Sequence, residues 1–292
     1  MSAAPDCVLY SMLTPDKSKT EDRIPPVIDA FPFDIKALAD RFEGPGVDAI
    51  GLMGSHARGE AGEFSDVDLY RFLDDEADPP PGSGSHLIDK RLVTVMDLHP
   101  YQVERWFERP EEAVKWITGL RQVYALKDET GVIADLRARA IAFTWDEAMQ
   151  QRANQYASRQ MVWWIEEVHK GLEGLRRNDA GRMLFGLIGL SWGIARLVQV
   201  QHGLLLPSEN EIFDALDRVF GLDSEWVRLR RITFGVGADG RLAFSLRERV
   251  MAGLKLYILT AATLRNVLQP DDAVVIQSVI ESIQGELTAL SR

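Results

Sequence analysis

Two carboxylates, Asp66 and Asp68, lie two residues apart in the otherwise apolar segment Ser65-Asp-Val-Asp-Leu-Tyr70. Residues i and i+2 of a β-strand project from the same face, so a strand at this point places both carboxylates side by side. Two negative charges that close repel each other unless a cation lies between them, and hard divalent cations prefer oxygen ligands. The spacing therefore predicts a divalent metal site on one face of a strand.

A glycine turn precedes the acidic pair. The apolar run from Ile50 to Met53 predicts a strand that stops at Gly54-Ser55, and the ten residues 56 to 65 separate this turn from Asp66. Glycine lets backbone N–H groups approach an anion without a side chain in the way. We therefore expect Gly54 and Ser55 to form a phosphate cradle, to which Arg58 adds positive charge. The alternative for Arg58 is a surface ion pair.

The turn and the acidic pair together resemble the motif of the polymerase-beta-like nucleotidyltransferase superfamily. That motif is an apolar residue, Gly, Gly or Ser, a spacer of similar length, and then Asp, apolar, Asp or Glu, apolar. The matching residues here are Met53, Gly54, Ser55, Asp66, Val67, Asp68 and Leu69. The flanking residues Ala57-Arg58-Gly59 and Ser65 also look similar to the aminoglycoside nucleotidyltransferases, a branch that confers antibiotic resistance.

The resemblance implies an enzyme that moves a nucleoside monophosphate, AMP from ATP in the first instance, to a hydroxyl of an aminoglycoside-like small molecule. It also implies two Mg²⁺ ions at Asp66 and Asp68, with the β- and γ-phosphates held by Gly54 and Ser55. Such an enzyme needs to supply little covalent chemistry, because catalysis depends on positioning the reactants and neutralising the charge of the phosphates.

A third acidic residue, from a neighbouring strand, completes the site in the resembled superfamily. Asp97 matches this position, because it lies near the end of the apolar strand predicted at Arg91 to Leu98. We expect Asp97 to share a metal ion or to act as the general base that takes the proton of the acceptor. The alternative is a cap on the helix that begins near Pro100. Asp89, in a predicted turn, is the fallback third carboxylate.

Composition limits the class of protein. Of the net charge of −11, residues 1 to 142 account for −10, with 16 Lys and Arg against 26 Asp and Glu. Nucleic-acid binding normally depends on clustered Lys and Arg, so a nucleic-acid acceptor is disfavoured and a cationic small molecule is compatible. The alternative is that the acidity serves only solubility.

Cysteine content and hydropathy favour a cytoplasmic protein without a membrane span. A single cysteine, Cys7, excludes a disulfide framework, and the N-terminus lacks a signal-peptide pattern. The longest nearly apolar run, Met183 to Ala195, is too short to cross a bilayer.

Hydrophobic periodicity predicts an α+β chain of two domains. Residues 1–142 are predicted to form a mixed β-sheet nucleotidyltransferase domain with flanking helices, with strands at 50–53, 66–72, 85–88, 91–98 and 122–126 and helices at 31–42, 100–109, 110–120 and 132–142. Residues 143–292 are predicted to form an all-α bundle with helices at 146–178, 180–202, 208–220, 224–231, 246–268 and 273–290. The resemblance implies that this bundle helps to bind the acceptor.

Small and large side chains in the predicted bundle have distinct roles. Gly186, Gly189 and Gly193 line one face of the second predicted helix, where they allow another helix to approach closely. We expect the tryptophans of this region to fill the core rather than to stack on a nucleobase: Trp163, Trp164 and Trp192.

Three other functions remain open. Some related nucleotidyltransferases modify a protein or an RNA end, as in toxin–antitoxin pairs. Arg196 and His202 loosely resemble the Arg-x(4–6)-His signature of the HEPN ribonucleases, although Leu197 stands where a polar residue is usual. The third is a nucleotide-binding regulator without turnover, and the intact carboxylates count against it.

Overall fold

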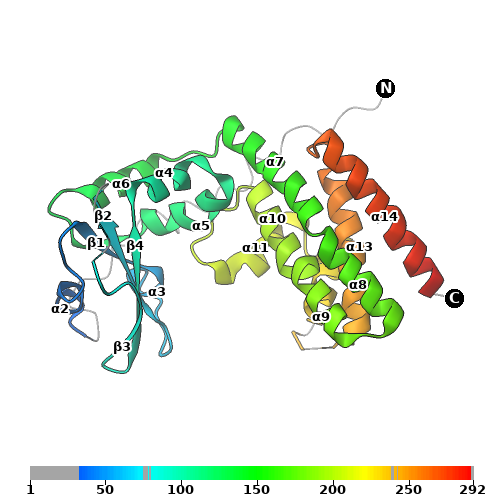
Figure 1. Ribbon diagram of the computed structural model, residues 1–292, viewed down its shortest axis with the longest axis horizontal. Helices are drawn as coiled ribbons and strands as arrows, with labels where there is room; N and C mark the ends of the chain where they lie inside the picture. The colour runs from blue at the N-terminus through cyan, green and yellow to red at the C-terminus, as the bar shows by residue number, and fades with distance from the viewer. Residues whose placement is uncertain (1–32, 75–77, 79, 238–239, 242, 291–292) are drawn as a thin grey trace. The chain divides into compact units, whose positions relative to one another are not determined.

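The computed structural model describes residues 33–74, 78, 80–237, 240–241 and 243–290. The prolines at 5, 15, 25 and 26 predict extended chain over residues 1–30, which lie outside the described range. The chain divides into two compact units, one of Met1–Tyr101 with Gly119–Ile141 and one of Gln102–Thr118 with Ala142–Arg292. The first holds a β-sheet and the second is helical (Figure 1), which confirms the predicted α+β fold.

Five strands form one mixed sheet in the order β3-β4-β2-β1-β5. Strand β2 pairs in parallel with β4, and all other neighbours are antiparallel. In the parallel pair, Asp68 lies opposite Thr94. This register decides which side chains of β4 share a face with the acidic pair. The strands are β1 (Val47–Met53), β2 (Val67–Leu73), β3 (Gly84–Ile88), β4 (Arg91–Leu98) and β5 (Tyr124–Lys127).

The two faces of the sheet have different neighbours. Val67 and Val93, which are paired across β2 and β4, belong to a buried cluster with apolar residues of α2 (Ile35–Asp40). Side chains alternate along a strand, so Asp68 and Thr94 project from the opposite face. The sheet therefore separates a closed apolar face from a face that carries the acidic pair.

Helix α2 begins later than residue 31, where the sequence predicts it. Asp34 is its N-cap, and the Asp34 carboxylate accepts a hydrogen bond from the backbone N–H of Ala37 at 3.0 Å. An aspartate cap satisfies a helix donor that lacks an intrahelical partner, so the helix starts directly after it.

The other helices lie mostly in the second unit, where they enclose one large buried cluster. Helices α3 (Gly54–Ala57) and α6 (Val132–Ala142) belong to the sheet unit, apart from the last residue of α6. The remaining helices are α4 (Pro100–Glu108), α5 (Pro110–Arg121), α7 (Glu147–Trp163), α8 (Ile165–Arg177), α9 (Ala180–Ile188), the π-helix η3 (Gly189–Gly193), α10 (Ile194–Gln201), the 3₁₀-helix η4 (Glu209–Glu211), α11 (Ile212–Phe220), α12 (Glu225–Phe234), α13 (Leu246–Leu264) and α14 (Pro270–Leu290).

Glycines bring α8 and α9 together, as their spacing predicts. A Cβ added at Gly186 would lie 2.8 Å from the backbone nitrogen of Gly171, and one at Gly189 would lie 2.8 Å from the Trp164 ring. Trp164 also interrupts the helix predicted over residues 146–178, because it is the junction between α7 and α8. The small residues therefore leave room both for a helix backbone and for an indole ring.

Only one of the three tryptophans packs on the core of the helical unit. Trp164 packs against the buried cluster, whereas Trp163 and Trp192 are 70% and 56% exposed. The expectation that all three fill the core is therefore wrong for Trp163 and Trp192. Trp164 takes the space above Gly189 and Gly193, and its neighbour Trp163 then points outward.

One stretch of the described residues, Ala180–Gln201, is long and apolar enough to cross a membrane by length and composition. Most of it, 72% of the apolar window, is buried inside the protein. It thus resembles the core helix of a helical unit.

Candidate active site

Asp66 and Asp68 lie at the start of β2 on one face of the sheet. Strand β2 begins at Val67, so Asp66 directly precedes the strand and Asp68 is its second residue. Across the sheet, Asp68 lies opposite Met53 of β1 and Thr94 of β4. The structure therefore brings the two carboxylates to the end of β1, where the glycine turn begins.

The two carboxylates repel each other in this arrangement. Burial and the charge of Asp66 raise the pKa of the Asp68 carboxyl to about 6, although the Arg58 guanidinium opposes this shift. Burial and the same two carboxylates also raise the pKa of the Tyr70 hydroxyl, which is next along that face. A cation beside the pair would offset both the burial and the repulsion, so the electrostatics fit a cation site.

Gly54 lies against the acidic pair. It begins the short helix α3 with a φ of +72°, in the left-handed region that favours glycine. A Cβ at this position would overlap the Oδ2 atom of Asp68. The first N–H groups of a helix have no partner inside it, so Ser55 and its neighbours offer donors next to the carboxylates. An anion bound at this turn would lie beside a cation bound by Asp68.

The loop between the turn and the acidic pair is held by hydrogen bonds between its own residues. The backbone N–H of Gly62 donates to Ser65 Oγ at 2.9 Å, and Arg58 Nε donates to the Glu60 carboxylate at 2.8 Å. Arg58 is thus in a surface ion pair, the alternative to a phosphate contact, while its charge still acts on Asp68. To reach a phosphate, Arg58 has to leave or share Glu60.

Asp97 lies away from the acidic pair. In the register of β2 and β4, Asp97 lies opposite Arg71. Arg71 is three positions beyond Asp68 along β2, and because side chains alternate, an odd separation places Arg71 and its partner Asp97 on the other face of the sheet. The Asp97 carboxylate accepts hydrogen bonds from Arg71 Nε at 2.6 Å and from Nη2 at 2.9 Å. The structure therefore gives Asp97 a different partner and does not bring it to Asp66 and Asp68.

Arg71 is fully buried, and Asp97 is only part of its environment. Its remaining N–H groups donate to the backbone carbonyls of Phe42 at 3.4 Å, Pro80 at 2.9 Å and Pro81 at 3.1 Å. The ion pair thus joins two strands to a proline-containing segment that precedes β3. Asp89, the fallback residue, lies in the turn between β3 and β4 with a φ of +49°.

Thr94 is a further polar residue of this site, and no sequence motif identifies it. Its hydroxyl donates to Asp66 Oδ2 at 3.3 Å, and it faces Asp68 in the register of β2 and β4. The sequence feature that marks Thr94 is its polarity: it lies between Leu92 and Met96 on the face of β4 that does not carry Asp97.

The donor set fits one divalent cation. Among the described residues, no group of three or more His, Cys, Asp and Glu side chains gathers where a metal ion would be held. Asp66 and Asp68 supply carboxylate oxygens, and a hard cation takes its remaining ligands from phosphate oxygens and water. The second ion expected from the resemblance has no ligand from Asp97.

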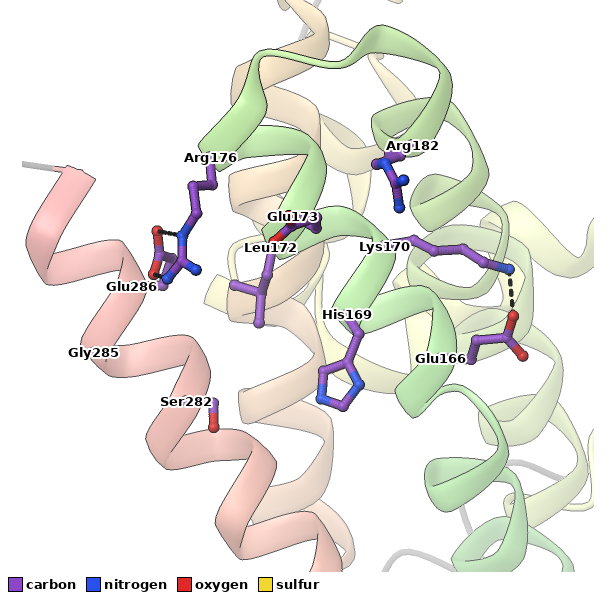
Figure 2. A pocket seen from close by; sticks show the side chains of 10 residues that line it. All are labelled: Glu166, His169, Lys170, Leu172, Glu173, Arg176, Arg182, Ser282, Gly285 and Glu286. Atoms are coloured by element: carbon purple, nitrogen blue, oxygen red, sulfur yellow. Dashed lines mark hydrogen bonds and ion pairs between the residues drawn. The ribbon is translucent and has the colours of Figure 1, made fainter.

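A cavity of about 740 Å³ lies within the helical unit and contains none of these residues. Figure 2 shows it between α8, α9 and α14, with Arg176 paired to Glu286 and Lys170 paired to Glu166. Arg182 at its edge is paired with Asp179. Because these cations already have carboxylate partners, we assign this cavity no ligand.

The fold and the site define the class of protein. A mixed sheet that sets two carboxylates beside a glycine turn offers ligands for a metal ion next to a turn that an anion can approach, the combination that phosphoryl and nucleotidyl transfer require. Residues 35–149 match the model of the family described as nucleotidyltransferase domain. This region therefore resembles a nucleotidyltransferase domain and supports a nucleotidyltransferase activity, and enzymes with this domain use a nucleoside triphosphate and a divalent metal ion.

Two further comparisons add no finer identity. No curated protein matches the chain. Among solved structures, a nucleotidyltransferase-like protein from Exiguobacterium sibiricum is 14% identical, with a TM-score of 0.42, and the similarity covers 86% of this chain and 76% of that chain. At that TM-score the neighbour carries no argument about this chain.

The contact between Gly54 and Asp68 leads to a testable expectation. Gly54→Ala should weaken the binding of ATP with Mg²⁺ by about 10- to 100-fold, because the added Cβ displaces the Asp68 carboxylate, and this is the usual loss in metal affinity when the orientation of a metal ligand is disturbed. Isothermal titration with ATP and Mg²⁺ measures the effect.

Gly59→Ala is the matched control for this substitution. Gly59 has a φ of +68°, but a Cβ there meets nothing within 4 Å, so the variant carries the same backbone strain without the overlap. If both variants bind ATP equally well, the phosphate cradle lies elsewhere.

The raised pKa of Asp68 predicts how metal affinity depends on pH. Above pH 6 the carboxylate is charged and the affinity for Mn²⁺ should be constant. Below about pH 6 a proton has to leave before the metal binds, so the affinity should fall by up to about tenfold per pH unit. Mn²⁺ titrations from pH 5 to pH 8 test this expectation, and an affinity that is unchanged at pH 5 contradicts it.

Proposed function

We propose that this protein is a Mg²⁺-dependent enzyme that transfers AMP from ATP to a hydroxyl of a small-molecule acceptor. The observation that supports the proposal is the close approach of Gly54 to Asp68, since a turn that an anion can approach then lies beside the carboxylates that would hold the metal ion. Bound Mg²⁺ supplies charge neutralisation at the transferred phosphate and lowers the pKa of the attacking hydroxyl.

Each residue of the site has a role in this proposal. Asp66 and Asp68 hold the metal ion, and Gly54 and Ser55 hold the β- and γ-phosphates of the nucleotide. Arg58 adds positive charge near the triphosphate when it leaves Glu60. Asp97 is not included, because Arg71 takes both of its oxygens.

The charge of the catalytic region supports a cationic acceptor. Residues 1–142 carry a net charge of −10, and such a field attracts a polycationic compound and repels a nucleic acid. An aminoglycoside is therefore the best single candidate, with antibiotic resistance in the cytoplasm as the setting. In this proposal residues 1–142 form the catalytic domain and residues 143–292 help to bind the acceptor.

The proposal is tested by product analysis. The full-length protein is incubated with Mg²⁺, each labelled nucleoside triphosphate in turn and a panel of aminoglycosides, with a protein extract and RNA ends as separate acceptors, and the products are identified by mass spectrometry. A small molecule that gains the mass of AMP is the expected result. Labelling confined to protein or to RNA ends would replace this proposal with the toxin–antitoxin type of activity.

The ribonuclease alternative gains no support from the residues on which it rests. Arg196 Nη1 donates to Gln199 at 2.8 Å and lies 3.4 Å from the Glu209 carboxylate. His202 packs edge-on against Phe220, and burial lowers the pKa of its imidazole. Each side chain thus has its own partner within the helical unit.

A further inference from the structure

We propose that Thr94 is the positioning residue of the acidic pair, and that its hydroxyl holds the Asp66 carboxylate in the orientation that metal binding requires. This inference rests on the proposed function, because it assigns Thr94 a role at the metal site of Asp66 and Asp68. The hydroxyl donates to Asp66 Oδ2 at 3.3 Å from the neighbouring strand.

Asp66 needs an anchor more than Asp68 does. Asp68 is inside β2, where pairing with Met53 and Thr94 on both sides fixes its backbone. Asp66 precedes the first paired residue of β2, so its backbone lies outside the ladder at the end of a ten-residue spacer. A side-chain hydrogen bond from the adjacent strand can fix the position of the Asp66 carboxylate, which the backbone pairing of β2 does not fix.

A neutral donor suits this position better than a third carboxylate would. Asp66 and Asp68 already repel each other, and a further negative charge on the same face would add to that repulsion. The Thr94 hydroxyl instead occupies one lone pair of Asp66 and leaves its other oxygen for a metal ion. The contact is long for an O–H···O hydrogen bond, as contacts at catalytic groups often are before substrate binds.

Thr94 also has an ordinary explanation, because β-branched residues favour strands. The two explanations predict opposite orders for two variants. Thr94→Val keeps the branched shape and removes the hydroxyl, so it harms a positioning role and spares a purely structural one. Thr94→Ser keeps the hydroxyl and removes the methyl group, so it spares a positioning role.

The test is a titration of the full-length protein with Mn²⁺ alone, followed by electron paramagnetic resonance, on wild type, Thr94→Val, Thr94→Ser and Asp68→Asn. We expect Thr94→Val to bind Mn²⁺ about tenfold more weakly than wild type, the usual loss when a group that orients a metal ligand is removed. Thr94→Ser should bind within about twofold of wild type, and melting curves should show that all the variants are folded. If Thr94→Val does not fold, Thr94→Ala replaces it as the variant without the hydroxyl.

The outcomes separate this inference from the proposed function. Equal Mn²⁺ affinity in Thr94→Val and wild type, together with loss of binding in Asp68→Asn, overturns the role of Thr94 and leaves the metal site in place. Mn²⁺ binding that does not depend on Asp68 overturns the metal site and the role of Thr94 together. Weaker binding in Thr94→Ser than in Thr94→Val shows that Thr94 is only a packing residue of the strand.

Discussion

Replacing Asp68 with Asn is expected to abolish nucleotidyl transfer and to leave the protein folded. Asparagine keeps the shape of the side chain but removes the charge that holds a cation beside the transferred phosphate. Losing several kcal/mol of charge stabilisation in the transition state corresponds to a turnover rate that is at least about 10³-fold lower. Turnover is measured with Mg²⁺, labelled nucleotide and the acceptor found by product analysis, and Asp66→Asn should behave in the same way.

The same substitution is expected to raise the melting temperature at pH 8. Because folding raises the pKa of Asp68 from 3.8 to about 6, the charged carboxylate opposes folding above pH 6, and this cost disappears as the pH falls from 6 through 3.8. Asparagine carries no charge, so the melting temperatures of variant and wild type should approach each other near pH 4.

Glu63→Gln is the control for Asp68→Asn. Glu63 is an exposed carboxylate in the spacer before the acidic pair, so its neutralisation should change neither turnover nor melting temperature. An Asp68→Asn variant that keeps its turnover, or one that is less stable than wild type at pH 8, contradicts the assignment of Asp68.

The part of the site that lies along one strand can be predicted from the sequence. The alternation of a β-strand fixes that Asp66 and Asp68 share a face, whatever the strand pairs with. An abrupt stop after an apolar run at Gly54-Ser55 likewise marks the end of β1, because glycine is the residue that accepts a positive φ without strain. Both inferences depend only on local geometry, and the structure places Gly54 against the Asp68 side chain.

The part that depends on pairing between strands cannot be predicted in the same way. Alternation shows that Thr94 and Asp97 lie on opposite faces of β4. The register between β4 and β2 decides which of these two residues lies on the same face as the acidic pair. A shift of one residue would have placed Asp97 on the face of Asp68, and the observed register places Thr94 there. The resemblance pointed to Asp97 because it matches a residue type near a strand end, which carries no information about register.

Arg71 carries the signal that would have corrected this expectation. It is a charged residue in the apolar strand β2, at an odd distance from Asp68, so it has to be on the closed face of the sheet. A buried guanidinium needs a carboxylate partner. In the neighbouring strand β4, Asp97 lies at an odd distance from Thr94 and therefore on the face opposite to Thr94. It is the carboxylate that pairs with Arg71.

Replacing Asp97 with Asn is expected to destabilise the protein by about 3–5 kcal/mol, because removing one partner of a buried ion pair leaves an uncompensated charge. Arg71 is fully buried, and the carbonyls of Phe42, Pro80 and Pro81 cannot neutralise it. Urea unfolding of variant and wild type measures the difference. Asp89→Asn is the control, since Asp89 is exposed in a turn at a positive φ that Asn tolerates, and its effect should stay within about 0.5 kcal/mol.

Turnover separates this structural role of Asp97 from a catalytic one. At a temperature where both proteins are folded, Asp97→Asn should keep most of the wild-type turnover and its Mn²⁺ affinity, because Asp97 lies on the other face of the sheet from Asp66 and Asp68. A third metal ligand or a general base would give the opposite result, with turnover lost by orders of magnitude and the free energy of unfolding little changed. That result would require a rearrangement in which Asp97 leaves Arg71 and crosses to the acidic pair, at the energetic cost of the buried charge that it leaves behind.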